Sequence, residues 1–266
     1  MALRLVAVGE IVLDVYLPEL DRHVGGISAN FARGAARAGA DVALHAAVGD
    51  DAAGAELARG VAGLEAHLAI LPGASAVQKI RIAADGERVF CGFDPGVLAR
   101  WRLDEAALAA LARADALALT SSAELGHVFR QGLTVPGPRL VADFSQESPD
   151  GDPAHPETWI APYLDRLAIA FVGGHPGFVE PLRAASAATG TVIALTAGAA
   201  GAWAFQHGHA HHQPSLATRI VDTTGCGDAF QGAFTAAWLG GAPIAASLRA
   251  GAELAAVVAS RRGAGA

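Results

Sequence analysis

The sequence predicts an α/β fold in which a mainly parallel central sheet is covered by helices on both faces. Short apolar runs alternate with segments of helical periodicity along most of the 266 residues. That order is typical of parallel sheets built from strand–helix–strand units. Hydrophobic residues make up 52% of the chain, which is enough to bury a sheet on both faces. We therefore expect a single α/β domain over residues 1–266.

The expected elements follow from these patterns in order. Leu3–Val8 is a short apolar run and predicts the first strand; Asn30–Ala38 is rich in small residues and predicts a helix. Asp104 has the position of a helix N-cap. Further strands are expected at Val42–Val48, Ala116–Leu119, Leu140–Asp143, Ala168–Val172 and Val192–Thr196, and further helices at Asp51–Gly60, Asp104–Ala112, Ala123–Gln131, Glu157–Leu164, Phe178–Thr189 and Ala229–Leu239.

One segment breaks the alternation of strands and helices. Val77–Ile82 alternates apolar with polar residues, Asp85-Gly86 is a favoured turn pair, and a second alternating run follows at 87–90. This pattern predicts a β-hairpin in a small solvent-facing sheet. Ile11–Leu17 is its expected partner strand, so the small sheet should comprise about residues 11–24 and 76–93.

The stretch Ile220–Phe230 is the most informative in the chain. Gly225 and Gly227 bracket Cys226 at the start of an expected helix, where free backbone N–H groups and the helix dipole favour an anion. The backbone of these three residues is therefore expected to form an anion hole, and Asp228 is the expected catalytic base. An ordinary glycine-rich turn, with Asp228 as a partner of the helix dipole, is the alternative.

A second glycine string stands near the N-terminus. It reads Gly25-Gly26-Ile27-Ser28-Ala29-Asn30, and Gly49-Asp50 follows after the next expected strand. Together with the C-terminal string, it resembles the two signatures of the PfkB (ribokinase-like) family of carbohydrate kinases. The resemblance spans nearly the whole chain and implies a ribokinase-like fold, in which the small sheet is a β lid over the sugar.

The resemblance also assigns an acceptor site. It implies that Asp14 and Asn30, with the Gly25-Gly26 backbone, bind sugar hydroxyls. A solvated loop carboxylate is the alternative for Asp14, and a helix N-cap is the alternative for Asn30.

The expected nucleotide side lies in the second half of the chain. Thr196-Ala197-Gly198-Ala199-Ala200-Gly201 resembles the nucleotide-side turn of the family, so we assign Thr196, Gly198, Gly201 and Thr223 to ATP binding. The family often carries Asn-x-x-Glu after a middle strand, whereas residues 173–180 read GGHPGFVE. The metal ligands are thus unknown, although Mg²⁺ tolerates water and nucleotide oxygens as ligands. ATP and Mg²⁺ are the implied cofactors, and a monovalent cation such as K⁺ is a further candidate.

The resemblance predicts ATP-dependent phosphorylation of a primary hydroxyl on a sugar or sugar derivative. Asp143-Phe144-Ser145 after a strand and the small lid are similar to the fructoselysine 6-kinase branch of the family. A nucleoside kinase and a non-catalytic or degenerate sugar- or nucleotide-binding homologue are the alternatives. An oxidoreductase lacks support, because no Gly-x-Gly-x-x-Gly follows the first strand. Relatives with such lids often pair through them, which predicts a homodimer whose hairpins cover each other's apolar positions, including Ile80.

Composition excludes several other classes. A formal charge of −7 without a Lys/Arg-rich stretch argues against nucleic acid as the main partner. Two cysteines do not suggest a disulfide framework. No stretch predicts a signal peptide or a membrane span, so we expect a cytoplasmic protein. The histidines at 207, 209, 211 and 212 are expected in a solvated hairpin rather than at a metal.

Overall fold

Nine strands form the main sheet of the computed structural model, which describes residues 3–145, 154–216 and 218–264. The sheet has the order β13-β12-β11-β10-β9-β8-β1-β4-β5. All neighbours from β5 to β11 are parallel, and β12 and β13 are antiparallel. This confirms the mainly parallel sheet. The strands are β1 (Arg4–Val8), β4 (Asp41–Gly49), β5 (Glu65–Leu71), β8 (Ala116–Thr120), β9 (Arg139–Asp143), β10 (Leu167–Gly173), β11 (Val192–Thr196), β12 (Ala202–Gln206) and β13 (His209–Gln213).

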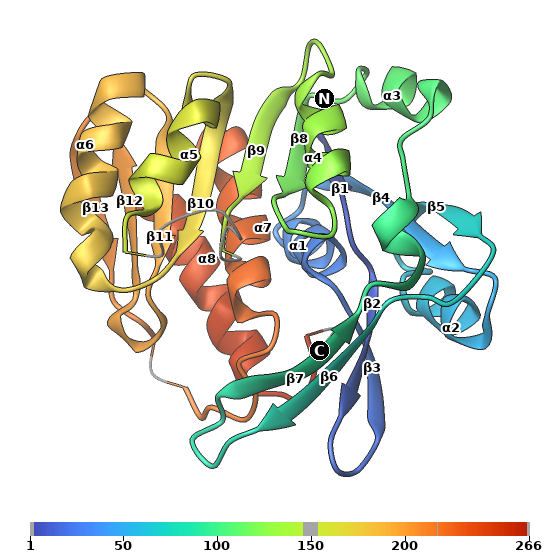
Figure 1. Cartoon of the computed structure of the whole chain (residues 1–266). Helices are drawn as coiled ribbons and strands as arrows, with labels where there is room; N and C mark the ends of the chain where they lie inside the picture. Colours follow the sequence, from blue (N-terminus) through green and yellow to red (C-terminus); the bar gives the residue numbers. More distant parts are fainter. Residues whose placement is uncertain (1–2, 146–153, 217, 265–266) are drawn as a thin grey trace.

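Helices cover both faces of this sheet (Figure 1). Side chains alternate along β1: Leu5 packs in the core on one face and Val6 in the core on the other. The face of Leu5 is covered by α1 (Ile27–Arg37), α2 (Ala52–Gly60), α7 (Cys226–Leu239) and α8 (Ile244–Ala259), and the face of Val6 by α3 (Glu105–Leu111), α4 (Gly126–Leu133), α5 (Pro156–Leu164) and α6 (Val179–Thr189).

A second sheet of four strands lies beside the main one (Figure 1). Its order is β3-β2-β6-β7, with β2 and β6 parallel and the outer pairs antiparallel. We call this sheet the lid; its strands are β2 (Val12–Tyr16), β3 (Asp21–Gly25), β6 (Val77–Ile82) and β7 (Arg88–Asp94). Because β2 starts four residues after β1 ends, the lid emerges directly from the carboxyl edge of the main sheet.

The structure corrects one expectation about the lid. Ile80 is 0% exposed in the single chain, so its own molecule covers it and no partner is needed there. Val89 and Phe90, on the neighbouring strand β7, are the exposed apolar residues of the hairpin, at 41% and 51%.

Two helices begin earlier than their patterns indicate. α1 starts at Ile27 rather than Asn30, and α7 starts at Cys226 rather than Ala229. In both cases the preceding glycine is the N-cap with a positive φ, 99° at Gly26 and 77° at Gly225. Glycine enters this region without the strain that a side chain imposes, and each glycine string thereby becomes a loop that ends in a helix N-terminus.

Candidate active site

A pocket of about 870 Å³ lies between the lid and the carboxyl ends of the main strands. Asp143, Gly173 and Thr196, at the ends of β9, β10 and β11, line it from the main sheet. Gln78 and Phe93 line it from the lid. Open parallel sheets collect ligands at this edge, and the N-terminus of α7 opens into the same space.

Asp228 stands in the first turn of α7 and faces this pocket. Asn30 Nδ2 donates a hydrogen bond to Asp228 Oδ2 at 2.9 Å, which fixes the carboxylate and leaves Oδ1 for a ligand. Burial raises the pKa of Asp228 to about 7, although the hydrogen bond from Asn30 opposes this rise. A carboxylate with a pKa near neutrality is suited to accept a proton.

Asn30 does not cap α1, since Gly26 has that position. Its Oδ1 accepts a hydrogen bond from Arg33 Nη1 at 3.1 Å, and this orients the amide towards Asp228. The structure thus joins two residues that are 198 positions apart in the chain.

The loop before α7 is held rigidly. Asp222 is 1% exposed and accepts hydrogen bonds from the backbone N–H groups of Thr224 and Gly263, both at 2.8 Å. Tyr16, from lid strand β2, donates its hydroxyl to the same carboxylate at 2.7 Å. At Gly225, a side chain would meet Ala264 Cβ at 2.3 Å, so this position needs glycine for space as well as for its φ.

The N–H donors available for an anion differ from the expected set at one residue, Cys226. The N–H group of Cys226 already donates to the carbonyl of Thr223 at 3.2 Å. Within the described ranges, the N–H groups of Gly225, Gly227 and Asp228 have no hydrogen-bond partner, so they are the available donors. Burial raises the pKa of the Cys226 thiol to about 12, which keeps it neutral and argues against a nucleophilic role.

Thr223 lines the same pocket as the other residues assigned to ATP, and it also contacts the lid. Its N–H donates to the carbonyl of Gly86 at 3.2 Å, and its hydroxyl donates to Glu87 Oε2 at 3.1 Å. The backbone N–H of Arg88 donates to the same hydroxyl at 3.3 Å. Thr223 therefore binds the tip of the lid to the loop that precedes α7.

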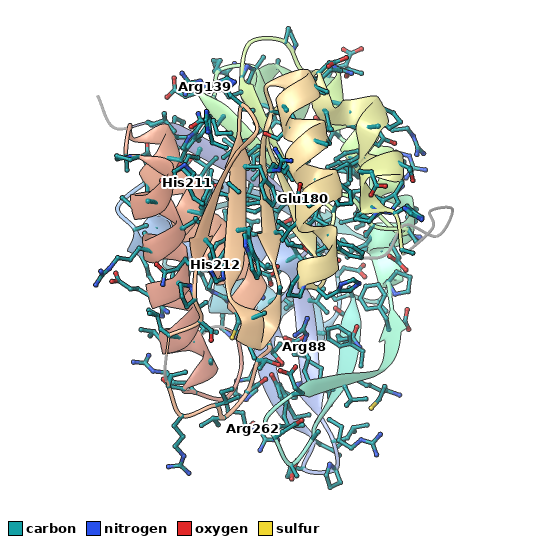
Figure 2. The ribbon with its side chains drawn as sticks, turned by 90° about the vertical axis from the view of Figure 1, so that its left-hand side faces the viewer. Arg88, Arg139, Glu180, His211, His212 and Arg262 are labelled. Atoms are coloured by element: carbon teal, nitrogen blue, oxygen red, sulfur yellow. The ribbon has the colours of Figure 1, made fainter. Side chains whose placement is uncertain are left out.

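Arg88 is a site residue that the sequence pattern did not reveal. Its guanidinium lies over the ring of Phe90, 5.3 Å from the centroid, and it lines the pocket. Its charge helps to lower the pKa of both Asp228 and Cys226 against the stronger effect of burial. No other Lys or Arg of the described residues lines the pocket. Figure 2 shows Arg88 on the lid, below the hairpin that carries His211 and His212.

Asp14 is a buried strand residue and not a solvated loop carboxylate. It lies on β2, is 4% exposed and lines the pocket. A side chain at Gly25 would meet Asp14 Oδ2 at 2.0 Å, and one at Gly26 would meet the carbonyl of Glu10 at 2.8 Å. The two glycines thus make room for the Asp14 carboxylate and for the close passage of β2.

Four further carboxylates line the pocket and were not singled out from the sequence as site residues: Glu10, Glu87, Glu124 and Asp143. Glu10 stands two residues after the end of β1, and burial raises its pKa to about 7. Asp143 Oδ1 accepts from Gln231 Nε2 at 2.9 Å, whereas its Oδ2 is buried without a partner among the described residues. Burial raises the pKa of Asp143 as well.

The expected nucleotide side forms the far end of the pocket. Thr196, Gly198 and Gly201 all line it. Gly198 faces open space, whereas a side chain at Gly201 would strike the carbonyl of Gln213 at 2.3 Å. Small residues of α8 complete this end, namely Ala252, Ala255, Ala256 and Ala259. This part of the pocket is therefore lined mainly by small side chains.

A histidine of the β12–β13 hairpin contacts the neighbouring strand and the turn before it. His212 stacks on Trp203 with ring centroids 4.1 Å apart, and its Nε2 lies 3.0 Å from the carbonyl of Ala200. No group of three His, Cys, Asp or Glu side chains suited to a metal ion occurs within residues 3–145, 154–216 and 218–264. In these same ranges, no helix is long and apolar enough to cross a membrane.

The sequence profile of the pfkB family carbohydrate kinases matches residues 3–131 and 175–266. The chain belongs to this family. It is 30% identical to the fructoselysine 6-kinase of Escherichia coli over 95% of both chains. This kinase is therefore a phosphotransferase of the sugar and nucleoside kinase class, whose members bind a sugar-like acceptor and ATP.

Solved structures show the same fold at lower sequence identity. An adenosine kinase from Sinorhizobium meliloti superposes with a TM-score of 0.86 at 15% identity and covers 99% of this kinase and 96% of the other chain. The ribokinase of Arabidopsis thaliana, solved with ribose and ATP, gives a TM-score of 0.79 at 19% identity, with 100% and 95% covered. The ribokinase-like α/β fold expected from the two glycine strings is thus confirmed.

Proposed function

We propose that this kinase transfers the γ-phosphate of ATP to a primary hydroxyl of a sugar or sugar derivative. The observation that carries the proposal is the hydrogen bond between Asn30 and Asp228. It lies beside the N–H groups of Gly225 and Gly227, which have no partner among the described residues. A base and an anion hole at one helix start are what an in-line phosphoryl transfer requires.

Each part of the pocket has a role in this proposal. Asp228 Oδ1 accepts the proton of the acceptor hydroxyl as that oxygen attacks the γ-phosphorus, and the bond from phosphorus to the ADP oxygen breaks. The free N–H groups before and within the first turn of α7, with the Arg88 guanidinium, stabilise the negative charge on the transferring group. Asp14 and Asn30 orient the acceptor, and the closed lid excludes the water that would otherwise hydrolyse ATP.

A carboxylate oxygen at the end of β9 is suited to a metal ion. Asp143 Oδ2 is buried and unpartnered within the described part of the chain, next to the Gln231 and Asp228 side chains. Mg²⁺ keeps several waters and is commonly held by one or two carboxylates together with substrate phosphates. Asp143 fits that arrangement despite the missing Asn-x-x-Glu, and the ion would add positive charge beside the phosphates. A dependence on K⁺ stays a prediction.

The 30% identity to fructoselysine 6-kinase supports a fructoselysine-like sugar derivative as the acceptor. A non-catalytic homologue is a poorer explanation of Asp228. Its negative charge would repel a bound phosphate, and a protein that only binds nucleotide would not need it. The decisive test is ADP release from ATP and Mg²⁺ across a panel of sugars, amino sugars and nucleosides. Acceptor-dependent release that Asp228→Asn abolishes would support the proposal; release only with nucleosides, or none with any acceptor, would overturn it.

A further inference from the structure

Arg33, in the middle of α1, is a half-buried cation to which the proposed reaction gives no role. Within the described ranges it forms no ion pair. Its guanidinium instead donates to the backbone carbonyl of Val24 at 2.8 Å, to that of Gly60 at 3.2 Å, and to Asn30 Oδ1 at 3.1 Å. Charged groups are seldom withdrawn from water without a carboxylate partner, so this arrangement calls for an explanation.

The two carbonyl groups compensate the charge and fix the guanidinium in place. Gly60 is the last residue of α2, and carbonyl groups at a helix C-terminus carry partial negative charge and have no partner within the helix. Val24 lies on lid strand β3, and a side chain at Gly60 would meet Val24 Cγ2 at 2.4 Å, so α2 and β3 are in close contact here. Arg33 is therefore held between α1, α2 and the lid.

The third contact determines which way the Asn30 amide faces. An arginine side chain donates hydrogen bonds and cannot accept one, whereas an ionised carboxylate accepts and cannot donate. Asn30 lies between such a pair: its Oδ1 faces Arg33 Nη1, and its Nδ2 donates to Asp228 Oδ2 at 2.9 Å. A half-turn of the amide would place its amino group against the guanidinium and its oxygen against the carboxylate, so both hydrogen bonds would be lost.

This constraint matters most when the base receives its proton. In the proposed reaction Asp228 becomes a carboxyl group, which can donate as well as accept, and it could then bond an amide turned either way. Arg33 keeps its charge and its donors throughout, so the amide oxygen stays with the guanidinium. Asp228 Oδ2 thus remains bonded by Asn30 Nδ2, and Oδ1 is the oxygen that takes the proton.

We propose that Arg33 is a positioning residue of this kinase, which acts through Asn30 to keep Asp228 Oδ2 bonded and Oδ1 open to the acceptor hydroxyl. The inference rests on the proposed role of Asp228 as the base and adds the group that holds it in register. The same guanidinium bonds the carbonyl of Val24, so it also ties lid strand β3 to the base.

The test is a double-mutant cycle of Arg33→Gln and Asn30→Ala. ADP release is measured with ATP, Mg²⁺ and fructoselysine, or with the sugar of the panel that is turned over fastest. Glutamine both donates and accepts, so it no longer forces one orientation on Asn30, and it keeps a donor for the Val24 carbonyl. We expect Arg33→Gln to lower kcat about tenfold in the wild-type background and to change it little in the Asn30→Ala background. Arg33→Lys, whose ammonium group also only donates, should recover most of the loss.

Arg37→Gln is the matched control. It removes the same charge from α1 one turn further on, and the Arg37 side chain forms no hydrogen bond or ion pair in the described structure. Its kcat should stay close to that of wild type, which separates the hydrogen bond of Arg33 from the mere presence of a positive charge on α1. Thermal unfolding of each variant reports folding independently of turnover.

The Asn30 side chain provides a second measurement that needs no acceptor. Its amide signals in a proton–nitrogen correlation spectrum can be identified by their absence in Asn30→Ala. We expect these amide protons to exchange with water slowly in wild type and in Arg37→Gln, and about tenfold faster in Arg33→Gln, because the bond to Asp228 is no longer fixed.

Two results would overturn the positioning role and leave the sugar kinase intact. One is an equal loss of kcat in both backgrounds of the cycle, which would mean that Arg33 does not act through Asn30. The other is an Asn30 amide whose exchange is the same in wild type and Arg33→Gln. An absence of turnover with every acceptor of the panel would instead overturn the proposed function, and this role of Arg33 with it.

Discussion

Replacing Asp228, the proposed base, should make this kinase more stable. Asp228 has an ordinary pKa of 3.8, which burial raises to about 7, and this difference corresponds to about 4 kcal/mol against the ionised side chain. Because Asp228 is only partly covered and water reaches it from the pocket, we expect about 1–3 kcal/mol of this to appear in the free energy of unfolding. Asp228→Asn removes the charge and keeps an oxygen for the Asn30 amide.

The sign of the pH dependence follows from the direction of the pKa change. Between about pH 4 and pH 7 the unfolded chain releases this proton while the native state retains it, so stability falls as pH rises through this window. Above pH 7 the native state carries the unfavourable charge in full. The stabilising effect of Asp228→Asn should therefore be larger at pH 8 than at pH 5.

Thermal unfolding of the two proteins at both pH values provides the measurement. A gain of 1–3 kcal/mol corresponds to about 2–10 °C in Tm for a chain of this size. Asp165→Asn, an exposed carboxylate at the end of α5, should shift Tm by similar small amounts at both pH values. Turnover by Asp228→Asn should fall by about two to four powers of ten. The reasoning would be refuted if Asp228→Asn had a lower Tm than wild type at pH 8, or if its increase in Tm were the same at pH 5 and pH 8.

Other positions yield predictions of smaller scope. Arg88→Gln should lower kcat about 10- to 100-fold with little change in acceptor KM, because its charge serves the transferring phosphate; an effect confined to KM would contradict this role. Thr223→Val should lower kcat about 3- to 10-fold in the same assay, because it removes the hydroxyl that bonds Glu87 and the Arg88 amide. Unchanged kinetics would mean that other contacts hold the tip of the lid. Asp14→Asn should raise acceptor KM about 10-fold or more and leave the KM of ATP unchanged; equal changes in both would assign Asp14 to structure. If the kinase pairs through its lid, Phe90→Glu should yield a monomer in light scattering, and a wild-type monomer at micromolar concentration would exclude that dimer.

Local sequence patterns were sufficient for much of the fold. The apolar runs that became β8, β9, β10 and β11 match the structure to within a residue or two at each end. β5 was missed because Glu65–Leu71 is an edge strand in which Glu65 and His67 break the pattern, so that only residues 68–71 form an apolar run. α8 was missed because it is rich in alanine and has no acidic residue in its first turn to indicate its start.

The parts of the candidate site that lie close together in the sequence could be predicted. The parts that form only through contacts between distant residues could not. Glycines before a helix and an aspartate after them indicate an anion site on local grounds alone. Arg88 is an ordinary exposed strand residue until the fold brings the lid tip to Thr223, 135 residues away. Glu10 had a usable signal, because a carboxylate two residues after the first parallel strand lies at the ligand-binding edge.

The lid and the anion loop are joined at two adjacent residues, and this joins acceptor binding to phosphate positioning. Asp222 accepts the hydroxyl of Tyr16 on β2, and Thr223 bonds Glu87 and Arg88 at the tip beside β7. Asp14 lies on β2 as well, two residues before Tyr16. In the proposed mechanism, an acceptor that bonds Asp14 would steady β2, whose Tyr16 holds Asp222. Asp222 in turn holds the loop whose backbone N–H groups are proposed to bind the phosphate. We expect such an arrangement to favour transfer to the acceptor over transfer to water, since the anion loop is best ordered when the lid is occupied.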